Sequence, residues 1–326
     1  MSEYLLEVKG LKTYFNHSGT RVPAVDGVDF VVRKGETLGI VGESGCGKSV
    51  TAMSILRLLP PEASIVDGQV LFKGNDLAAF AEDRMTKIRG NEISMIFQEP
   101  MTSLNPAYTV GYQIVEAIRT HRKLDKKQAR SLAIDMLKLV GIPAPERRAD
   151  QYPHELSGGM RQRVMIAMAL SCNPELLIAD EPTTALDVTV QAQILEVMKE
   201  LKRKFNMSIM MITHDLGVVA EMADYVIVMY AGTVVEYSDV KSLYKKPLHP
   251  YTEGLMDSLP KIDDPKDELQ AIQGTVPSLY DMPEGCNFWP RCPRAQDVCK
   301  REKPELYQVD DRKVRCFLYS DRMGER

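Results

Sequence analysis

The feature that most constrains this chain is a glycine-rich octapeptide, Gly-Glu-Ser-Gly-Cys-Gly-Lys-Ser, at residues 42–49. It follows a short apolar segment, Thr37–Val41, and precedes Val50–Leu59, which is predicted to be a helix ending at Pro60. In a loop of this form, backbone N–H groups converge on phosphate oxygens, and side chains at the glycines would block that approach. The sequence therefore predicts a nucleotide phosphate site between a buried strand and a helix. The residues expected to line it are Gly42, Glu43, Ser44, Gly45, Cys46, Gly47, Lys48 and Ser49.

Charged and hydroxyl side chains near this loop suit phosphoryl chemistry. Lys48 is expected to neutralise the β- and γ-phosphates of ATP, and the Ser49 hydroxyl is expected to bind Mg²⁺. Asp180 ends the apolar segment Leu176–Asp180, where its carboxylate would lie near the Mg²⁺. Glu181 follows directly, in a position to orient the attacking water. Both acids stand at the carboxyl end of a strand, where α/β sheets bind ligands.

Two further polar residues follow apolar segments in the same way. Gln98 comes after Ile93–Phe97 and is predicted to reach both Mg²⁺ and the catalytic water. His214 comes after Ile209–Thr213 and is predicted to hydrogen bond the γ-phosphate. Cys46 lies within the phosphate loop itself. Because helix N-termini lower thiol pKa values, we hypothesise that alkylating agents attack it and that ATP protects it, the alternative being a small residue tolerated there.

Hydrophobic periodicity predicts an α/β fold. Apolar and polar residues alternate over Leu5–Phe15 and Val25–Val32, which indicates a small antiparallel β layer. Two buried strands, Leu176–Asp180 and Ile209–Thr213, flank a predicted long helix, Val188–Phe205, and this alternation is typical of a mainly parallel sheet.

The chain is expected to hold two domains. We predict a nucleotide-binding domain over residues 1–246, with a helical subdomain at about 86–170 that has loops at Glu99-Pro100 and Asn105-Pro106. From Pro247 onward, prolines and the charged run Lys261–Glu268 mark a linker. This linker leads to a C-terminal extension over residues 247–326 that bears cysteines.

Composition limits the possible partners of the chain. The 326 residues carry a net charge of −4, which leaves no basic surplus for nucleic acid, and none is expected as a partner. No apolar stretch approaches the roughly 20 residues of a membrane span, and the N-terminal residues are not expected to form a secretory signal.

The order of these motifs resembles that of the ATP-binding subunits of ABC transporters over roughly residues 5 to 245. The match includes the phosphate loop, Gln98, Leu176–Glu181, Ala185-Leu-Asp187 and His214. The resemblance implies a head-to-tail dimer in which a signature segment of one subunit covers the γ-phosphate bound by the other; a helix N-terminus suits that anion. Phe15 sits where the family places an aromatic side chain that stacks on adenine, the alternative being a buried strand residue. The signature segment consists of Leu156, Ser157, Gly158, Gly159 and Met160, and Met160 departs from the usual Gln.

Within that group, the chain resembles ATPase subunits of bacterial and archaeal dipeptide and oligopeptide importers. The resemblance rests on Phe97–Pro106, Ser157–Ala169, Thr213–Val219, Leu248–Thr252 and Gly285–Pro293. It implies ATP-driven closure of a pair with a second, non-identical ATPase subunit, and reopening of this heterodimer on hydrolysis. It also implies two transmembrane permease subunits, an extracytoplasmic substrate-binding protein, and a peripheral place on the cytoplasmic side of the cell (inner) membrane. Gln98–Pro106 is expected to couple nucleotide state to the permease.

Alternatives remain for the transported solute and for the class of ABC ATPase to which the chain belongs. Nickel importers belong to the same subfamily, so nickel or another small solute is an alternative cargo. A non-transport ABC ATPase is a second possibility, although such proteins typically carry two cassettes or a long coiled-coil insertion, which this chain lacks. A regulatory subunit that binds nucleotide without turnover is a third, but Glu181 and His214 are both present.

Four of the six cysteines gather near the C-terminus with the spacing C-x₅-C-x₆-C-x₁₆-C. Four thiolates suit tetrahedral Zn²⁺ or a [4Fe–4S] cluster, and the spacing lacks the C-x₂-C pairs common in structural zinc sites. The family resemblance favours a structural [4Fe–4S] cluster, while Zn²⁺ and free packing cysteines remain alternatives. The predicted ligands are Cys286, Cys292, Cys299 and Cys316.

Overall fold

The computed structural model describes residues 3–17, 19–98, 103–184, 186–258 and 272–320. The predicted loop at Glu99-Pro100, the residue Ala185 and the charged run at 261–268 lie outside these described residues. The chain divides into two compact units. Unit 1 comprises residues up to Leu6, Val32–Thr37 and Phe72–Thr213, and unit 2 comprises Glu7–Val31, Leu38–Leu71 and residues from His214 onward.

Unit 1 contains a parallel sheet whose strands are almost entirely apolar. The strands β6 (Ile93–Ile96), β7 (Leu176–Asp180) and β8 (Ser208–Ile212) lie in that order, with Ile93 opposite Leu176 and Leu176 opposite Ser208. All five residues of β7 and of β8 are buried, as expected for a parallel sheet covered on both faces.

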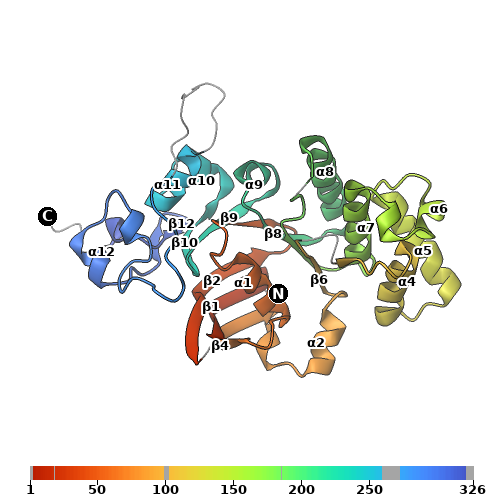
Figure 1. Cartoon of the computed structure of the whole chain (residues 1–326), viewed down its shortest axis with the longest axis horizontal. Coiled ribbons are helices and arrows are strands. Elements are labelled where there is room, and N and C mark those ends of the chain that lie inside the picture. Colours follow the sequence, from red (N-terminus) through yellow and green to blue (C-terminus); the bar gives the residue numbers. More distant parts are fainter. Residues whose placement is uncertain (1–2, 18, 99–102, 185, 259–271, 321–326) are drawn as a thin grey trace. The chain divides into compact units, whose positions relative to one another are not determined.

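Helices make up most of the rest of unit 1. Helix α5 packs against α4, α6 and α7, and Figure 1 shows these four helices gathered together. The elements are β5 (Asn75–Asp76), α2 (Glu82–Ile88), α4 (Val110–His121), α5 (Lys126–Leu139), α6 (Pro145–Ala149), α7 (Gly158–Leu170) and α8 (Val188–Phe205), with short 3₁₀ turns at Leu77–Ala79 and Pro153–Glu155. Among the residues that the structure describes, no helix combines the length and apolar character that crossing a membrane requires.

Unit 2 holds two sheets. The first has the order β2 (Thr20–Arg33), β1 (Tyr4–His17), β4 (Ala63–Phe72). In the second, β3 (Thr37–Val41) runs parallel to β9 (Tyr225–Tyr230). The second sheet then continues with antiparallel strands beyond β9, namely β10 (Thr233–Asp239), β12 (Arg312–Val314) and β11 (Tyr307–Val309).

Cysteine-bearing residues near the C-terminus share a hydrophobic core with the strand that leads into the phosphate loop. Val41 of β3, Val228 of β9, Tyr251 and Phe288 belong to one buried cluster, and Cys292 packs against it. The boundary predicted at residue 247 therefore falls inside a common core. The helices of unit 2 are α1 (Lys48–Leu56), α9 (Leu216–Met222), α10 (Val240–Lys245), α11 (Pro250–Asp257) and α12 (Asp297–Arg301), with 3₁₀ turns η3 (Trp289–Arg291) and η4 (Phe317–Tyr319).

The predicted α/β class with an antiparallel β layer is confirmed, while some element boundaries differ. Helix α1 begins at Lys48, inside the phosphate loop, and ends at Leu56 because Arg57 adopts a left-handed conformation with φ +53°. The region expected to be helical at about 86–170 also contains the strand β6. Its first helix, α2, begins earlier, at Glu82.

Candidate functional site

The phosphate loop joins β3 to α1, and its backbone requires glycine at two positions. Gly42 has φ +152°, and a Cβ there would lie 2.2 Å from the carbonyl oxygen of Met229. Gly47 has φ +97°, and a Cβ there would lie 2.4 Å from the carbonyl oxygen of Ala24. The backbone of β9 and the backbone at Ala24 thus lie close against these two glycines of the loop. A larger residue at either glycine would displace the loop.

Lys48 is held against the loop from which it projects. The side chain is buried, and its Nζ donates to the carbonyl oxygens of Gly42, at 2.8 Å, and Glu43, at 3.0 Å. Ser49 is half-buried in the first turn of α1. The predicted phosphate and Mg²⁺ groups therefore lie together at a helix N-terminus, which favours anions.

The hypothesis that Cys46 is a reactive thiol is wrong for this conformation. Cys46 is only 1% exposed, and burial raises the pKa of its thiol despite the nearby Lys48. A buried thiol with a raised pKa is a poor nucleophile. The alternative, a small residue that fits the loop, agrees with the packing of its sulfur 2.7 Å from the position of a Cβ on Gly42.

Glu181 is the centre of a hydrogen-bond network in unit 1. Gln98 Nε2 donates to its Oε2 at 3.1 Å, and Thr184 Oγ1 donates to the same oxygen at 2.8 Å. The Glu181 backbone is left-handed, with φ +46°, and its N–H donates to Ile212 at the end of β8. Such conformations are sparsely populated and gather at functional sites. The neighbouring Asp180 is buried at the end of β7.

The signature segment forms the N-terminus of α7. Ser157 is the N-cap residue, and its Oγ accepts from the N–H of Met160 at 3.3 Å. Ser157 and Gly158 are exposed, whereas Leu156 is buried. A Cβ at Gly159 would lie 2.8 Å from Cγ1 of Val190 in α8, so only glycine fits there without movement. Exposed amides at the start of a 13-residue helix suit an anion.

The remaining predicted ATP residues belong to unit 2. His214 is exposed just after β8, and Phe15 is partly buried in β1. Unit 2 thus carries the phosphate loop, Phe15 and His214, and unit 1 carries Gln98, Asp180, Glu181 and the signature segment.

The four C-terminal cysteines are free thiols that line one cavity in unit 2, together with Phe288, Trp289 and Phe317. Burial raises the pKa of Cys286 to about 11 and that of Cys316 to about 12. Among the described residues, no three His, Cys, Asp or Glu side chains are arranged to hold a metal ion. The ligand assignment made from the sequence therefore stays a prediction.

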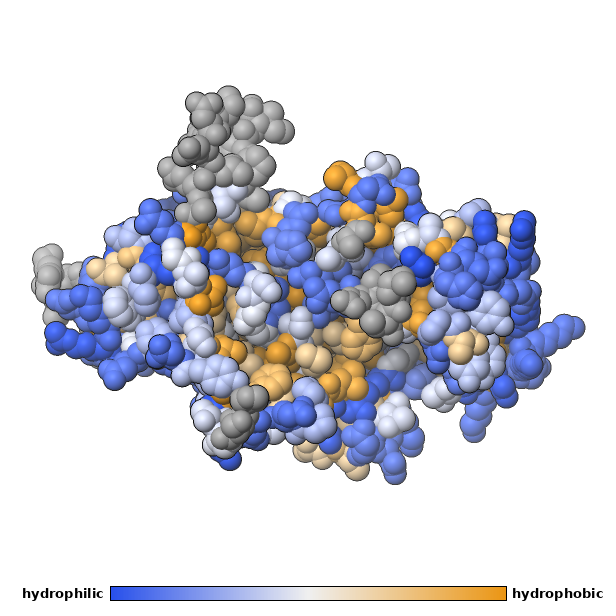
Figure 2. All heavy atoms as spheres, in the orientation of Figure 1, coloured by the Kyte–Doolittle hydropathy of each residue, from blue (hydrophilic) through white to orange (hydrophobic). Residues whose placement is uncertain are grey.

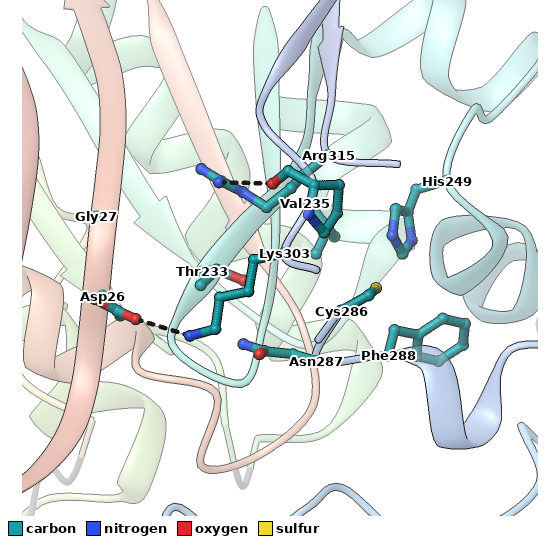
Figure 3. Close-up of a pocket in the computed structure, with 11 residues that line it drawn as sticks. Asp26, Gly27, Thr233, Val235, His249, Cys286, Asn287, Phe288, Lys303 and Arg315 are labelled. Atoms are coloured by element: carbon teal, nitrogen blue, oxygen red, sulfur yellow. Dashed lines mark hydrogen bonds and ion pairs between the residues drawn. The ribbon is translucent and has the colours of Figure 1, made fainter. Parts of the chain in front are cut away.

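Cys286 also borders a second cavity, of about 220 Å³ (Figure 3). An ion pair between Lys303 and Asp26, at 3.4 Å, closes one side of this cavity, and Arg315 donates to the carbonyl oxygen of Pro304 at 3.3 Å. The Lys303–Asp26 pair ties the cysteine-bearing segment to β2. Arg315 ties the segment to β10, because its Nε donates to the carbonyl oxygen of Val234 at 2.9 Å.

Sequence reasoning missed the residues that hold the predicted groups in place. Thr184 bonds Glu181, and Gln162 of α7 donates to the carbonyl oxygen of Pro182 at 2.5 Å. Arg291 forms an ion pair with Glu43 of the phosphate loop. Thr184 was close enough in sequence to Glu181 to be found, whereas the partner of Arg291 lies 248 residues away.

Comparison with known proteins identifies the family. Residues 25–184 match the ABC transporter family, and residues 235–299 match the C-terminal region of oligopeptide/dipeptide transporters. The oligopeptide transport ATP-binding protein AppD of Bacillus subtilis (strain 168) is 57% identical over 324 residues, which is 99% of each chain. The dipeptide transport ATP-binding protein DppD of Haemophilus influenzae is 51% identical over 320 residues, covering 98% of this chain and 97% of DppD.

Solved structures of ABC cassettes share the fold. The dimeric structure of MJ0796, a bacterial ABC transporter cassette, superposes with a TM-score of 0.65 at 29% identity, over 72% of this chain and 98% of that one. CbiO1 of Clostridium perfringens, part of the transporter complex cbiONQ, also gives a TM-score of 0.65, at 28% identity over 75% and 92% of the two chains. The chain therefore belongs to the ATP-binding proteins of ABC transporters, in the oligopeptide/dipeptide transporter family.

Proposed function

We propose that this chain is the ATPase subunit that energises import of dipeptides and oligopeptides through separate membrane subunits. ATP binding closes a dimer of ATPase subunits, and hydrolysis reopens it. Family membership supports the ATPase, and relatives named as oligopeptide and dipeptide transport proteins support the cargo.

The observation that carries this proposal is the hydrogen-bond network around Glu181. Gln98 and Thr184 both donate to one carboxylate oxygen, which fixes the orientation of the side chain. A carboxylate held in this way can accept a proton from the water that attacks the γ-phosphate. Ser49, Gln98 and Asp180 are the residues proposed to hold Mg²⁺, and His214 is proposed to contact the γ-phosphate.

The signature segment is proposed to serve the nucleotide bound to a second, non-identical ATPase subunit. Exposed Ser157 and Gly158 at the start of α7 offer backbone amides to an anion from another chain. Figure 2 shows hydrophobic residues at the surface over α8, and Val188 at its first turn is 83% exposed. A hydrophobic patch on the surface suits burial by a partner. Because the proposed partner is not identical to this chain, its signature segment need not carry a residue like Met160, and the two sites of a heterodimer need not be equivalent.

A cavity of about 440 Å³ in unit 1 is proposed to receive a permease subunit. It is bordered by β6, α4 and α7 and is lined by Met95, Met165 and Met168. Methionine side chains adapt to varied partners. Phe97 lines the same cavity and is 43% exposed, next to Gln98. A permease segment bound here would contact Phe97, so a movement of Gln98 that follows a change of nucleotide would be transmitted to the permease. This docking, on the cytoplasmic side of the membrane, would make the chain a peripheral subunit.

The C-terminal cysteines are proposed to hold a structural [4Fe–4S] cluster. All four line one cavity with aromatic walls, which excludes solvent from a cluster. The raised thiol pKa values imply that binding releases protons. Anaerobic Cys316→Ser protein should lose iron and sulfide, whereas Cys172→Ser should retain them; wild-type protein without either contradicts the cluster.

The function is tested by Glu181→Gln in the transporter reconstituted with its permease subunits, second ATPase and binding protein. ATP binding should persist, while hydrolysis and uptake of labelled di- and oligopeptides fall at least about a hundredfold. Uptake of Ni²⁺ by the wild-type transporter, with no uptake of peptide, would favour the nickel alternative. Wild-type turnover in Glu181→Gln would refute the role of Glu181.

A further inference from the structure

Glu43, the second residue of the phosphate loop, is held at three points. Its carbonyl oxygen accepts from Lys48 Nζ at 3.0 Å, and its N–H donates to the hydroxyl oxygen of Tyr251 at 2.9 Å. Its carboxylate forms a two-pronged ion pair with Arg291, with Nη1–Oε2 at 2.7 Å and Nη2–Oε1 at 3.1 Å. Two of the three contacts come from beyond residue 247, in the part of the chain that bears the cysteines.

Arg291 is built into its position. Its side chain is 4% exposed. Besides Glu43, its guanidinium donates to the carbonyl oxygens of Gln273, at 3.0 Å, and Ile272, at 3.3 Å, and lies 5.8 Å from the centre of the Tyr230 ring. Bidentate Arg–carboxylate pairs are geometrically specific, and a planar guanidinium fixed at several points has little freedom to move.

Tyr251 belongs to the same rigid assembly. Its ring packs against Tyr230 at 4.7 Å and against Phe288 at 5.4 Å between ring centres. Tyr230 ends β9, the strand that runs parallel to β3 and so flanks the phosphate loop. The contacts to Glu43 therefore arise from a packed aromatic core and not from a surface ion pair.

The negative charge of Glu43 is expected to affect ATP binding. A carboxylate in a loop that receives a triphosphate repels the ligand unless a cation compensates it. Arg291 supplies that compensation. Its two-pronged ion pair also fixes Glu43, whose carbonyl oxygen accepts from Lys48. We propose that Arg291 is a positioning residue for ATP, which neutralises Glu43 and keeps the loop in the conformation that accepts the phosphates. This inference rests on the proposed role of the loop.

Titration calorimetry with a non-hydrolysable ATP analogue and Mg²⁺, using the full chain, tests the inference. Arg291→Gln should weaken binding about tenfold, because it leaves the Glu43 carboxylate, whose side chain is 31% exposed, uncompensated in the loop proposed to bind the phosphates. The KM for ATP should rise while kcat at saturating ATP changes little. Arg294→Gln is the matched control, since Arg294 pairs with Glu253 of α11 and not with Glu43.

Rescue separates charge compensation from general stability. The double variant Glu43→Gln/Arg291→Gln should bind more tightly than Arg291→Gln, because no charge remains uncompensated. Folded Arg291→Gln that binds as wild type, or a double variant as weak as the single one, overturns the inference. If Arg291→Gln does not fold, Arg291→Lys replaces it: its weakening should vanish with Glu43→Gln present, and equal weakening in both backgrounds overturns the inference. Failure of wild-type protein to bind nucleotide, or binding unaffected by Lys48→Ala, would instead contradict the proposed function.

Discussion

Gln98 donates a hydrogen bond to Glu181 at 3.1 Å, although the two residues stand 83 positions apart. The contact follows from the sheet, since β6 and β7 are parallel neighbours and their carboxyl ends meet at one edge. Gln98 comes two residues after β6, and Glu181 comes directly after β7. Any movement of the segment that carries Gln98 therefore acts on the carboxylate proposed as the catalytic base.

Thr184→Val should lower ATP turnover about tenfold without weakening ATP binding. The variant removes the hydroxyl that donates to Glu181, and a hydrogen bond to a charged group contributes about 1.5 kcal/mol, or about tenfold in rate if it is needed in the transition state. Steady-state hydrolysis and nucleotide titration measure the two effects separately.

A suitable control for this prediction is Thr120→Val, on the exposed surface of α4. Its hydroxyl donates within its own helix, to the carbonyl oxygen of Glu116 at 2.9 Å. Turnover should be unchanged in this variant. Equal turnover in Thr184→Val and wild type would show that Thr184 does not position Glu181.

Gly159→Ala should impair hydrolysis that depends on the partner subunit by at least about fivefold, because overpacking moves the start of α7. The added methyl group would meet Val190 at 2.8 Å. Val190→Ala makes room, so Gly159→Ala/Val190→Ala should recover most of the activity. ATP binding to the chain's own loop should be the same in all three variants. A double variant no better than Gly159→Ala would mean that the glycine is needed for close approach of the nucleotide instead.

The sequence could predict what depends on local spacing. The turn between β3 and α1 was predictable because the glycines, Lys48 and Ser49 are contiguous. The meeting of Gln98 with Glu181 was foreseeable because each follows an apolar strand and parallel strands end at the same edge. The roles assigned to these residues remain predictions.

Contacts set by packing could not be predicted in the same way. Cys46 was hypothesised to be reactive because a helix N-terminus lowers thiol pKa values, with a tolerated small residue as the alternative, yet tertiary packing buries it and raises its pKa. The pair of Arg291 with Glu43 joins residues 248 positions apart, and no periodicity or motif in the sequence predicts such a contact. The start of α1 at Lys48 was also missed, since glycine-rich residues carry little helical signal.

Cys46 should resist alkylation in the folded protein with and without ATP. Burial raises its pKa, so at pH 8 less of it is thiolate than of an ordinary cysteine, and the sulfur is also shielded. Ser44→Cys places a thiol at an exposed position of the same loop and should label rapidly, with protection by ATP. Mass spectrometry of the labelled peptide distinguishes the two positions. Rapid labelling of Cys46 at neutral pH would mean that the loop opens in solution.

Loss of the proposed cluster should weaken ATP binding only through its effect on Arg291. Cys292 directly follows Arg291, and both belong to the segment that packs on Tyr230 and Phe288. Cys292→Ser should therefore weaken ATP binding in the wild-type background and cause no further weakening when Arg291→Gln is present, a non-additivity that a double-mutant cycle measures. Cys172→Ser, in unit 1, is the control and should leave affinity unchanged. Additive losses from Cys292→Ser and Arg291→Gln would show that the cysteine cavity and the phosphate loop are independent.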